Sequence, residues 1–158
     1  MNPPILAAIR ELLTSRGVAF EERQHGPTTT SEDSAQARGE ELGVGAKALL
    51  LRTDDVFRLL VLPADRKLDS KAVKQHLNVK NVRFATPDEL RERTGLVPGA
   101  VPPFGPPILP FELFADASVG VRYSKVAFNA GSLTDSIIMS AADWLAVANP
   151  SRFAFAKD

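Results

Sequence analysis

The sequence predicts an α+β fold in a single domain, with a mixed, mostly antiparallel sheet and helices packed on it. Short apolar runs typical of strands alternate with amphipathic stretches that begin at helix start signals. The two longest strand-like runs are separated by a tight turn, which indicates a hairpin. The 158 residues contain no repeat, low-complexity tract or linker that would divide them. We therefore expect one domain over residues 1–158.

The N-terminal part is expected to hold two helices around a short strand. Apolar residues with helical spacing follow Pro4 and stop at Gly17, Val18–Glu21 alternates as a strand, and a polar helix should run from about Glu32 to Glu41. Thr30 or Ser31 is a suitable N-cap for that helix. Capping is the simplest role for these hydroxyls, and contact of one of them with a ligand is the alternative, because a helix N-terminus suits an anionic or carbonyl group.

A β-hairpin is predicted for the centre of the sheet. Its strands, Ala46–Arg52 and Val56–Leu62, are apolar on both faces, as strands buried on both sides are. Lys47 is unusual because it shares a strand face with leucines. Such a lysine is paired, neutral or extended outward to water, and an outward extension is the common case. A functional role is the alternative. The glycines before Lys47 match neither a Walker A loop nor a dinucleotide fingerprint, because Ala48 and a strand follow.

Two more helices and a short strand come next. Ser70–Leu77 should be a helix, Val82–Phe84 a strand, and Thr86 with Pro87 and Glu89 a strong helix start. Six lysines or arginines against two aspartates give residues 65–84 a local charge of +4. Such a cluster is usually a basic surface exposed to water, and the alternative hypothesis is a patch that contacts the phosphates of a nucleic acid.

The segment Gly95–Pro110 holds six of the twelve prolines and three of the ten glycines. Proline removes a backbone donor and glycine permits positive φ, so the segment is neither a helix nor a central strand. Its apolar side chains need packing partners, so we expect a stiff, ordered loop over the core. Such a loop is either functional or a cover for a sheet edge. Beyond it we expect strands at Phe111–Phe114, Val119–Tyr123, Val126–Phe128 and Ser136–Met139, a helix capped by Ser140, and a terminal strand near Phe153 and Phe155.

The composition excludes several kinds of function. The net charge is zero, so no global field attracts nucleic acid, and a nucleic-acid partner would be held locally. There is no cysteine and there are only two histidines, so we expect no metal site, no cofactor and no protein nucleophile of the common kinds. No apolar run is long enough for a membrane span and the N-terminus lacks the features of a signal peptide, so we expect a cytoplasmic protein.

Several spaced motifs, in order along the chain from His25 to Met139, resemble the YbaK/ProX family, the free-standing relatives of the editing domain inserted in bacterial prolyl-tRNA synthetases. The motifs are Gly43–Lys47, Leu60–Asp69, Val82–Leu90, Thr94–Gly105 and Phe128–Ser132.

The resemblance implies a curled mixed β-sheet flanked by helices, and hydrolysis in trans of the ester of a small mischarged amino acid on tRNA(Pro) or a related tRNA. It implies no metal or cofactor. The partner would be the mischarged tRNA, and an aminoacyl-tRNA synthetase is a further partner that the resemblance allows.

The resemblance also assigns residues. Lys47 takes the place of the family's invariant catalytic lysine, and Gly95–Pro103 that of the loop that offers backbone groups to the aminoacyl ester. A ribose hydroxyl of the terminal adenosine would assist attack by water. The substrate-binding residues would be Thr30, Gly99, Ala100, Val101, Pro102, Asn129, Gly131 and Ser132.

Two departures bear on which amino acid is removed. Ala48 stands where some branches have Asn, and Asn129 where prolyl-editing relatives often have His. We expect the aminoacyl pocket to be lined by Phe20, Val44, Val101 and Met139. Two other functions stay open, namely a non-catalytic tRNA-binding module and a small-molecule ester hydrolase on the same fold.

Overall fold

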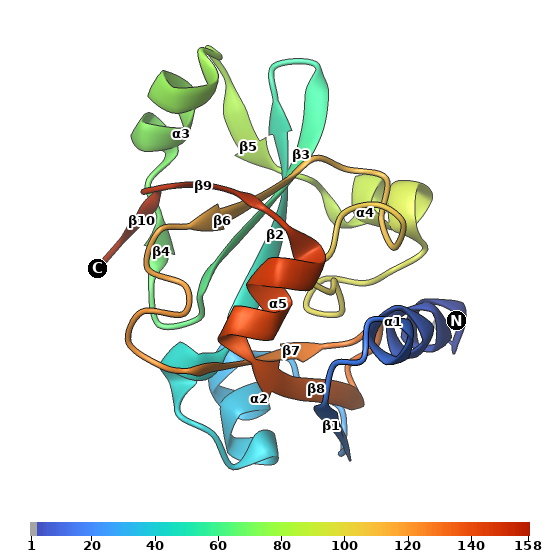
Figure 1. The fold of residues 1–158 in the computed structure, drawn as a ribbon. Helices are drawn as coiled ribbons and strands as arrows, with labels where there is room; N and C mark the ends of the chain where they lie inside the picture. The colour runs from blue at the N-terminus through green and yellow to red at the C-terminus, as the bar shows by residue number, and fades with distance from the viewer. Residues whose placement is uncertain (1–2) are drawn as a thin grey trace.

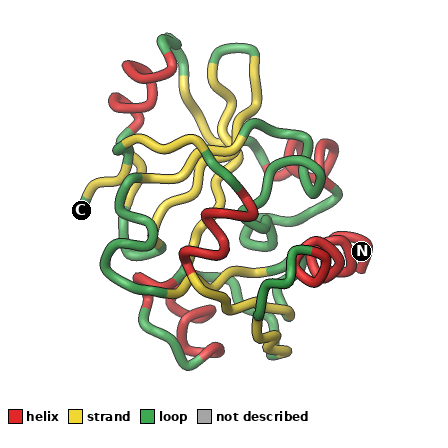
Figure 2. The backbone as a smooth tube through the Cα atoms, in the orientation of Figure 1, coloured by secondary structure: helices red, strands yellow, loops and turns green. Residues whose placement is uncertain are grey.

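The computed structural model describes residues 3–158, so residues 1 and 2 of the predicted domain lie outside its description. The helices, with one 3₁₀ turn, are α1 (Pro3–Ser15), α2 (Ser31–Arg38), η1 (Leu42–Val44), α3 (Ser70–Leu77), α4 (Pro87–Thr94) and α5 (Ala141–Ala148). The strands are β1 (Phe20–Gln24), β2 (Ala46–Thr53), β3 (Val56–Pro63), β4 (Lys67–Leu68), β5 (Val82–Phe84), β6 (Leu113–Asp116), β7 (Lys125–Asn129), β8 (Asp135–Ser140), β9 (Ser151–Phe153) and β10 (Ala156–Lys157). Figures 1 and 2 show the helices packed around the strands, which confirms the α+β class.

The predicted hairpin lies in the middle of a five-stranded sheet with the order β5-β2-β3-β6-β9. β2 pairs antiparallel with β3 and β5, whereas β6 pairs parallel with β3 and β9. Alternate side chains of the hairpin enter two different cores: Leu50 and Leu59 join the main cluster, and Leu51 and Leu60 join a second one on the opposite face. The expectation that both faces of the hairpin are buried is therefore confirmed.

A second, three-stranded antiparallel sheet has the order β1-β8-β7. It meets the five-stranded sheet at an isolated bridge between Gly45 and Ala127. This bridge places the start of β2 beside the middle of β7, in the lower half of Figure 1. A third, two-stranded sheet pairs β4 with β10.

The Gly/Pro loop is ordered and lies over the main core, as expected. Its residues Leu96, Ala100 and Phe104 are all buried in this core. Its backbone is also anchored from outside, because the fully buried indole of Trp144 donates through Nε1 to the carbonyl of Pro103 at 3.0 Å.

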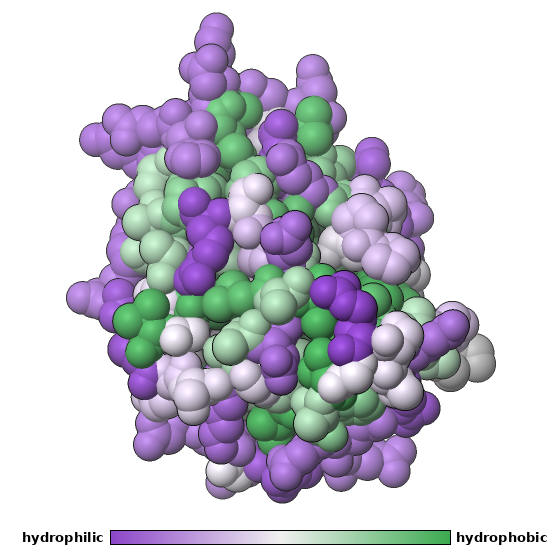
Figure 3. All heavy atoms as spheres, viewed as in Figure 1, coloured by the Kyte–Doolittle hydropathy of each residue, from purple (hydrophilic) through white to green (hydrophobic). Residues whose placement is uncertain are grey.

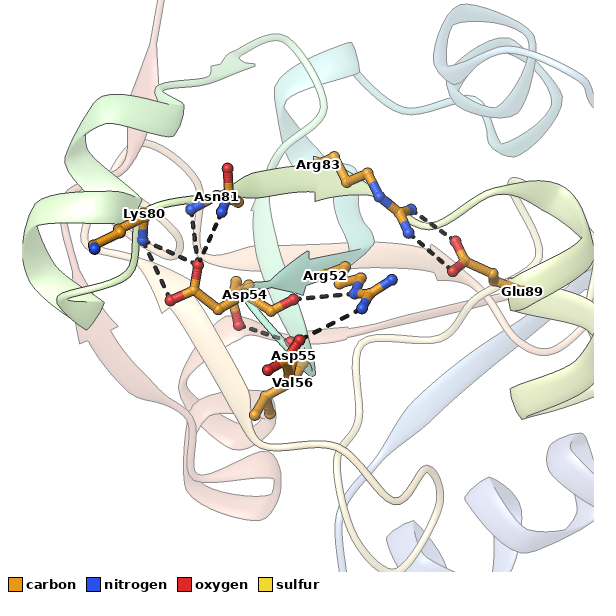
Figure 4. A network of polar contacts seen from close by, with 9 residues as sticks. Arg52, Asp54, Asp55, Val56, Lys80, Asn81, Arg83 and Glu89 are labelled. Atoms are coloured by element: carbon orange, nitrogen blue, oxygen red, sulfur yellow. Dashed lines mark hydrogen bonds and ion pairs between the residues drawn. The ribbon is translucent and has the colours of Figure 1, made fainter.

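The tip of the central hairpin is held by a polar network (Figure 4). The carboxylate of Asp54, whose φ is +53°, accepts hydrogen bonds from the backbone N–H groups of Lys80 at 3.1 Å and Asn81 at 2.9 Å. These bonds, that from Asn81 above all, hold the pKa of Asp54 below its usual value.

Helix α4 begins at the predicted capping box, in which Thr86 accepts from the backbone N–H of Glu89 and the Glu89 carboxylate accepts from that of Thr86. The Arg83 guanidinium donates two hydrogen bonds to the same carboxylate, at 2.7 and 3.0 Å (Figure 4). Together these bonds, led by those from Arg83, lower the pKa of Glu89 to about 2.

Some element boundaries were predicted wrongly. Val119–Tyr123 is not a strand, because the N–H of Val119 bonds to the carbonyl of Asp116 in a turn and Gly120 has φ +83°. The second helix ends at Arg38 rather than Glu41, because Gly39 takes a left-handed conformation with φ +72°.

The surface is mostly hydrophilic on the face shown in Figure 3, with hydrophobic side chains visible between the charged ones. Among the described residues, the exposed large hydrophobic ones are Val56, Phe84, Val97 and Val121. Within residues 3–158, no helix combines the length and the apolar character needed to cross a bilayer.

Candidate active site

A cleft of about 710 Å³ opens where the two larger sheets meet. Its lining comes from α2 and the loop before it, the start of β2, the β5–α4 connection, the Gly/Pro loop and the end of β7. A volume of this size suits a small organic group.

Five of the residues assigned from the sequence line this one cleft, although they are far apart in the chain: Thr30, Lys47, Gly99, Val101 and Asn129. The Thr30 hydroxyl accepts from the backbone N–H of Asp33 at 3.0 Å, so it caps α2 as expected while lying in the cleft wall.

The other four assigned residues do not line the cleft. Ala100 and Pro102 belong to the Gly/Pro loop but are buried and do not line the cleft. Gly131 contacts the loop from outside, since its N–H donates to the carbonyl of Ala100 at 3.0 Å. The hydroxyl of Ser132 donates to the carboxylate of Asp135 at 2.8 Å, in the turn between β7 and β8. Of the expected aminoacyl pocket, Val101 lines the cleft, whereas Phe20, Val44 and Met139 do not.

Lys47 is exposed, at the second position of β2. It belongs to none of the ion pairs formed among residues 3–158. Its stem begins on a buried strand and its ammonium extends outward, which is the outward extension considered above. The charge is therefore available to a ligand in the cleft.

The Gly/Pro loop reaches the same cleft at Val101 and at Gly99, which has only backbone atoms to offer. Gly99 has φ +90°, a conformation that favours glycine. Its carbonyl accepts a hydrogen bond from the Nδ2 group of Asn129 at 2.8 Å. Within residues 3–158, no hydrogen bond has the N–H group of Gly99 or Val101 as its donor.

Arg38, the last residue of α2, is a cleft residue that the sequence analysis missed. It is only 6% exposed, and it donates through Nε to the Ser136 hydroxyl at 2.9 Å and through Nη2 to Asn129 Oδ1 at 3.0 Å. The signal in the sequence was the small pair Ser34 and Ala35 one helical turn before Arg38, which marks the buried face of an otherwise polar helix.

A serine–histidine pair lies behind this network, with His25 Nε2 at 2.8 Å from the hydroxyl of Ser136. The pair resembles an activated nucleophile, but Ser136 is 1% exposed and does not line the cleft. Its hydroxyl also contacts Arg38 and Asn129. The geometry therefore favours a structural role for the pair. Among residues 3–158, no three His, Asp or Glu side chains are grouped so as to hold a metal ion.

Hydroxyl groups dominate the wall formed by α2 and the loop before it. Thr28, Thr29, Ser31 and Ser34 all line the cleft there. Ser34 donates to the hydroxyl of Thr28 at 2.9 Å, and both residues are buried. This wall can accept or donate hydrogen bonds to a small polar group.

Comparison with known proteins identifies the family. The model of the aminoacyl-tRNA editing domain matches residues 25–147. The chain is 36% identical over 144 residues to the multifunctional Ser/Thr-tRNA deacylase ProXp-y of Escherichia coli, covering 88% of this chain and 85% of the relative. It is 32% identical over 81 residues to the proline–tRNA ligase of Bacillus velezensis, which covers 51% of this chain and 14% of that protein.

The fold has a counterpart among solved structures. It matches the crystal structure of a candidate trans-editing enzyme for prolyl tRNA synthetase with a TM-score of 0.81 at 24% identity, over 100% of both chains. The resemblance seen in the sequence motifs is thus confirmed by independent comparisons of sequence and fold. The chain belongs to the family of aminoacyl-tRNA editing domains.

Proposed function

We propose that the protein is a trans-editing deacylase that hydrolyses the ester bond of a mischarged aminoacyl-tRNA. The observation that carries the proposal is the cleft itself, which is lined both by Lys47, a lysine with no ion-pair partner among residues 3–158, and by Gly99 and Val101 of the Gly/Pro loop. Such a site can bind and polarise an ester without supplying a nucleophile.

In this proposal Lys47 holds the terminal nucleotide, through a phosphate or the ribose edge, so that the ester lies against Gly99 and Val101. The backbone N–H groups of these two residues stabilise the negative charge that develops on the carbonyl oxygen. Water attacks the carbonyl carbon with help from a ribose hydroxyl. The bond from this carbon to the ribose oxygen then breaks, and a free amino acid and a deacylated tRNA leave.

The lining supports a small hydroxylated amino acid, serine or threonine, as the group removed. The hydroxyl-rich wall of the cleft offers hydrogen bonds that alanine could not use. This choice agrees with the name of the Escherichia coli relative, a Ser/Thr-tRNA deacylase. Which tRNA carries the amino acid, tRNA(Pro) or another, would be set by contacts outside the cleft.

The test is deacylation of a panel that contains seryl, threonyl, alanyl and cysteinyl esters on tRNA, with serine methyl ester as a small-molecule control. We expect seryl- or threonyl-tRNA to be hydrolysed fastest and the methyl ester not at all. Binding of tRNA without hydrolysis would show a non-catalytic module, and hydrolysis of the methyl ester at a comparable rate would show a small-molecule esterase. Either result would overturn the proposal.

A further inference from the structure

Arg38 is a buried cation that forms no ion pair within residues 3–158, although the carboxylate of Glu40 is near enough to favour its charged form. Only 6% of its surface is exposed. Burial lowers the pKa of its guanidinium to about 10, so it is still charged at neutral pH. A buried unpaired charge is unfavourable, and an apolar residue of similar size would pack there at a lower cost.

The donors of Arg38 reach a single amide. Nη2 donates to Asn129 Oδ1 at 3.0 Å, and Nε donates to the Ser136 hydroxyl, whose oxygen lies 3.1 Å from the same Oδ1. Two hydrogen-bonded groups therefore surround the oxygen end of the Asn129 side chain. They define which end of the amide faces Arg38 and which end faces the cleft.

The other end of that amide contacts the loop. Asn129 Nδ2 donates to the carbonyl of Gly99 at 2.8 Å. If the amide turned over, its oxygen would face the Gly99 carbonyl, and two acceptors would repel each other. The donors of Arg38 prevent this, because they can bond only to an oxygen. The hydrogen bond to the Gly99 carbonyl thus depends on a guanidinium whose own hydrogen bonds within residues 3–158 go to Ser136 and Asn129 and not to the loop.

We propose that Arg38 is a positioning residue for the deacylation reaction: through the Asn129 amide it fixes the Gly99 carbonyl, and with it the backbone wall of the cleft. This rests on the proposed function, because the loop matters to catalysis only if its backbone binds the ester. A displacement of about 1 Å in such a wall can reduce the rate about a hundredfold.

The test compares Arg38→Met, Arg38→Lys and Asn129→Asp with wild type, and Arg16→Met serves as a control at an exposed arginine outside the cleft. The values of kcat and KM for aminoacyl-tRNA, and the Tm, are measured for each. We expect Arg38→Met to lower kcat about a hundredfold with KM little changed. Arg38→Lys should recover little, because an ammonium lacks the planar fork that reaches both acceptors.

Asn129→Asp separates positioning from simple stability. Its carboxylate would pair with the Arg38 guanidinium, so the Tm should be maintained or raised. It has no donor for the Gly99 carbonyl, so kcat should still fall. The double variant Arg38→Met/Asn129→Ala, which leaves no buried charge, should lose no more activity than the worse of its two single variants. Additive losses, or a kcat that only follows the unfolded fraction, would overturn the proposal.

Hydrogen exchange provides a readout that does not need activity. The N–H groups of Ala100 and Gly131 bond within or onto the loop. These two amides should exchange faster in Arg38→Met than in wild type. In the control Arg16→Met they should exchange at the wild-type rate. Unchanged exchange at both amides would overturn the role of Arg38. Failure of the wild type to deacylate any tRNA would overturn the proposed function alone.

Discussion

Lys47 lies directly opposite Leu62 in the antiparallel register of β2 and β3, yet Leu62 is 1% exposed and Lys47 is exposed. The strand pair therefore needs an apolar residue on one strand only. At the other position the ammonium leaves the sheet and joins the cleft lining. Leu62 therefore contributes to packing, whereas Lys47 is left for the proposed chemistry.

Lys47→Ala should therefore fold with an almost unchanged Tm, because an exposed and unpaired charge is removed. Deacylation should fall about a hundredfold or more, the scale for loss of one preorganised donor or charge. Lys47→Arg should recover only part of the rate, because the guanidinium is larger and bonds in a different geometry. Single-turnover deacylation with a Tm measurement checks both variants. A folded Lys47→Ala that deacylates at the wild-type rate would remove Lys47 from the mechanism.

Gly99→Val should damage the cleft wall. Gly99 has φ +90°, and a Cβ there would lie 3.3 Å from Leu133 Cδ2. We expect a loss of about 1–3 kcal/mol in the free energy of unfolding and a deacylation rate lower by about a hundredfold. Gly26→Val is the matched control, since a Cβ at Gly26 meets no heavy atom within 4 Å. If Gly99→Val kept full activity, we would conclude that the loop only covers a sheet edge and does not take part in the reaction.

The basic residues of α3 should contribute to tRNA binding. Lys71 and Lys74 are both exposed and lie outside the cleft. Changing both to Glu should weaken tRNA binding and reduce the slope of log affinity against log salt by about 1 to 2, with little change in Tm. Filter binding across a salt titration measures this. An unchanged slope would mean that tRNA binds to another surface. The exposed Arg91 and Arg93 would then be tested next.

Asp116 should make stability depend on acid pH. Burial alone would raise the pKa of its carboxylate, but hydrogen bonds from Ser118 and from the N–H groups of Phe155 and Ala156 outweigh it and lower the pKa. The carboxylate therefore stabilises the fold above the ordinary aspartate pKa of about 3.9, and this contribution is lost as the pH falls through the lower, folded value. Asp116→Asn should cost about 2 kcal/mol at pH 7.

Denaturant unfolding at several pH values checks this prediction. The difference between wild type and Asp116→Asn should be constant from pH 7 to about pH 5 and narrow below about pH 4. A difference that persists unchanged in acid would mean that the carboxylate charge is not the cause.

Local patterns in the sequence predicted much of the fold. The central hairpin is clear because its two apolar runs flank Asp54 and Asp55, and the start of α4 is clear because its capping box is complete within four residues. The pattern from Val119 to Tyr123 resembled a strand, but consecutive turns use its backbone groups.

The site was harder to predict because its contacts are long-range. Lys47 stood out as a charge among leucines, and the Gly/Pro loop by its composition. Arg38 did not stand out, because its partners Asn129 and Ser136 lie 91 and 98 residues away. The small residues Ser34 and Ala35 indicate a buried face of α2, but no local pattern indicates which distant residues Arg38 will contact there. Only the packing of α2 on the second sheet reveals it.

The conformation of the Gly/Pro loop depends in part on residues outside the loop. Its carbonyls at Gly99, Ala100 and Pro103 accept hydrogen bonds from Asn129, Gly131 and Trp144 respectively. A loop grafted alone onto a related scaffold would therefore lose its conformation unless these donors were transferred with it. Redesign of the amino acid preference should accordingly treat the loop and its three anchors as one transplantable unit.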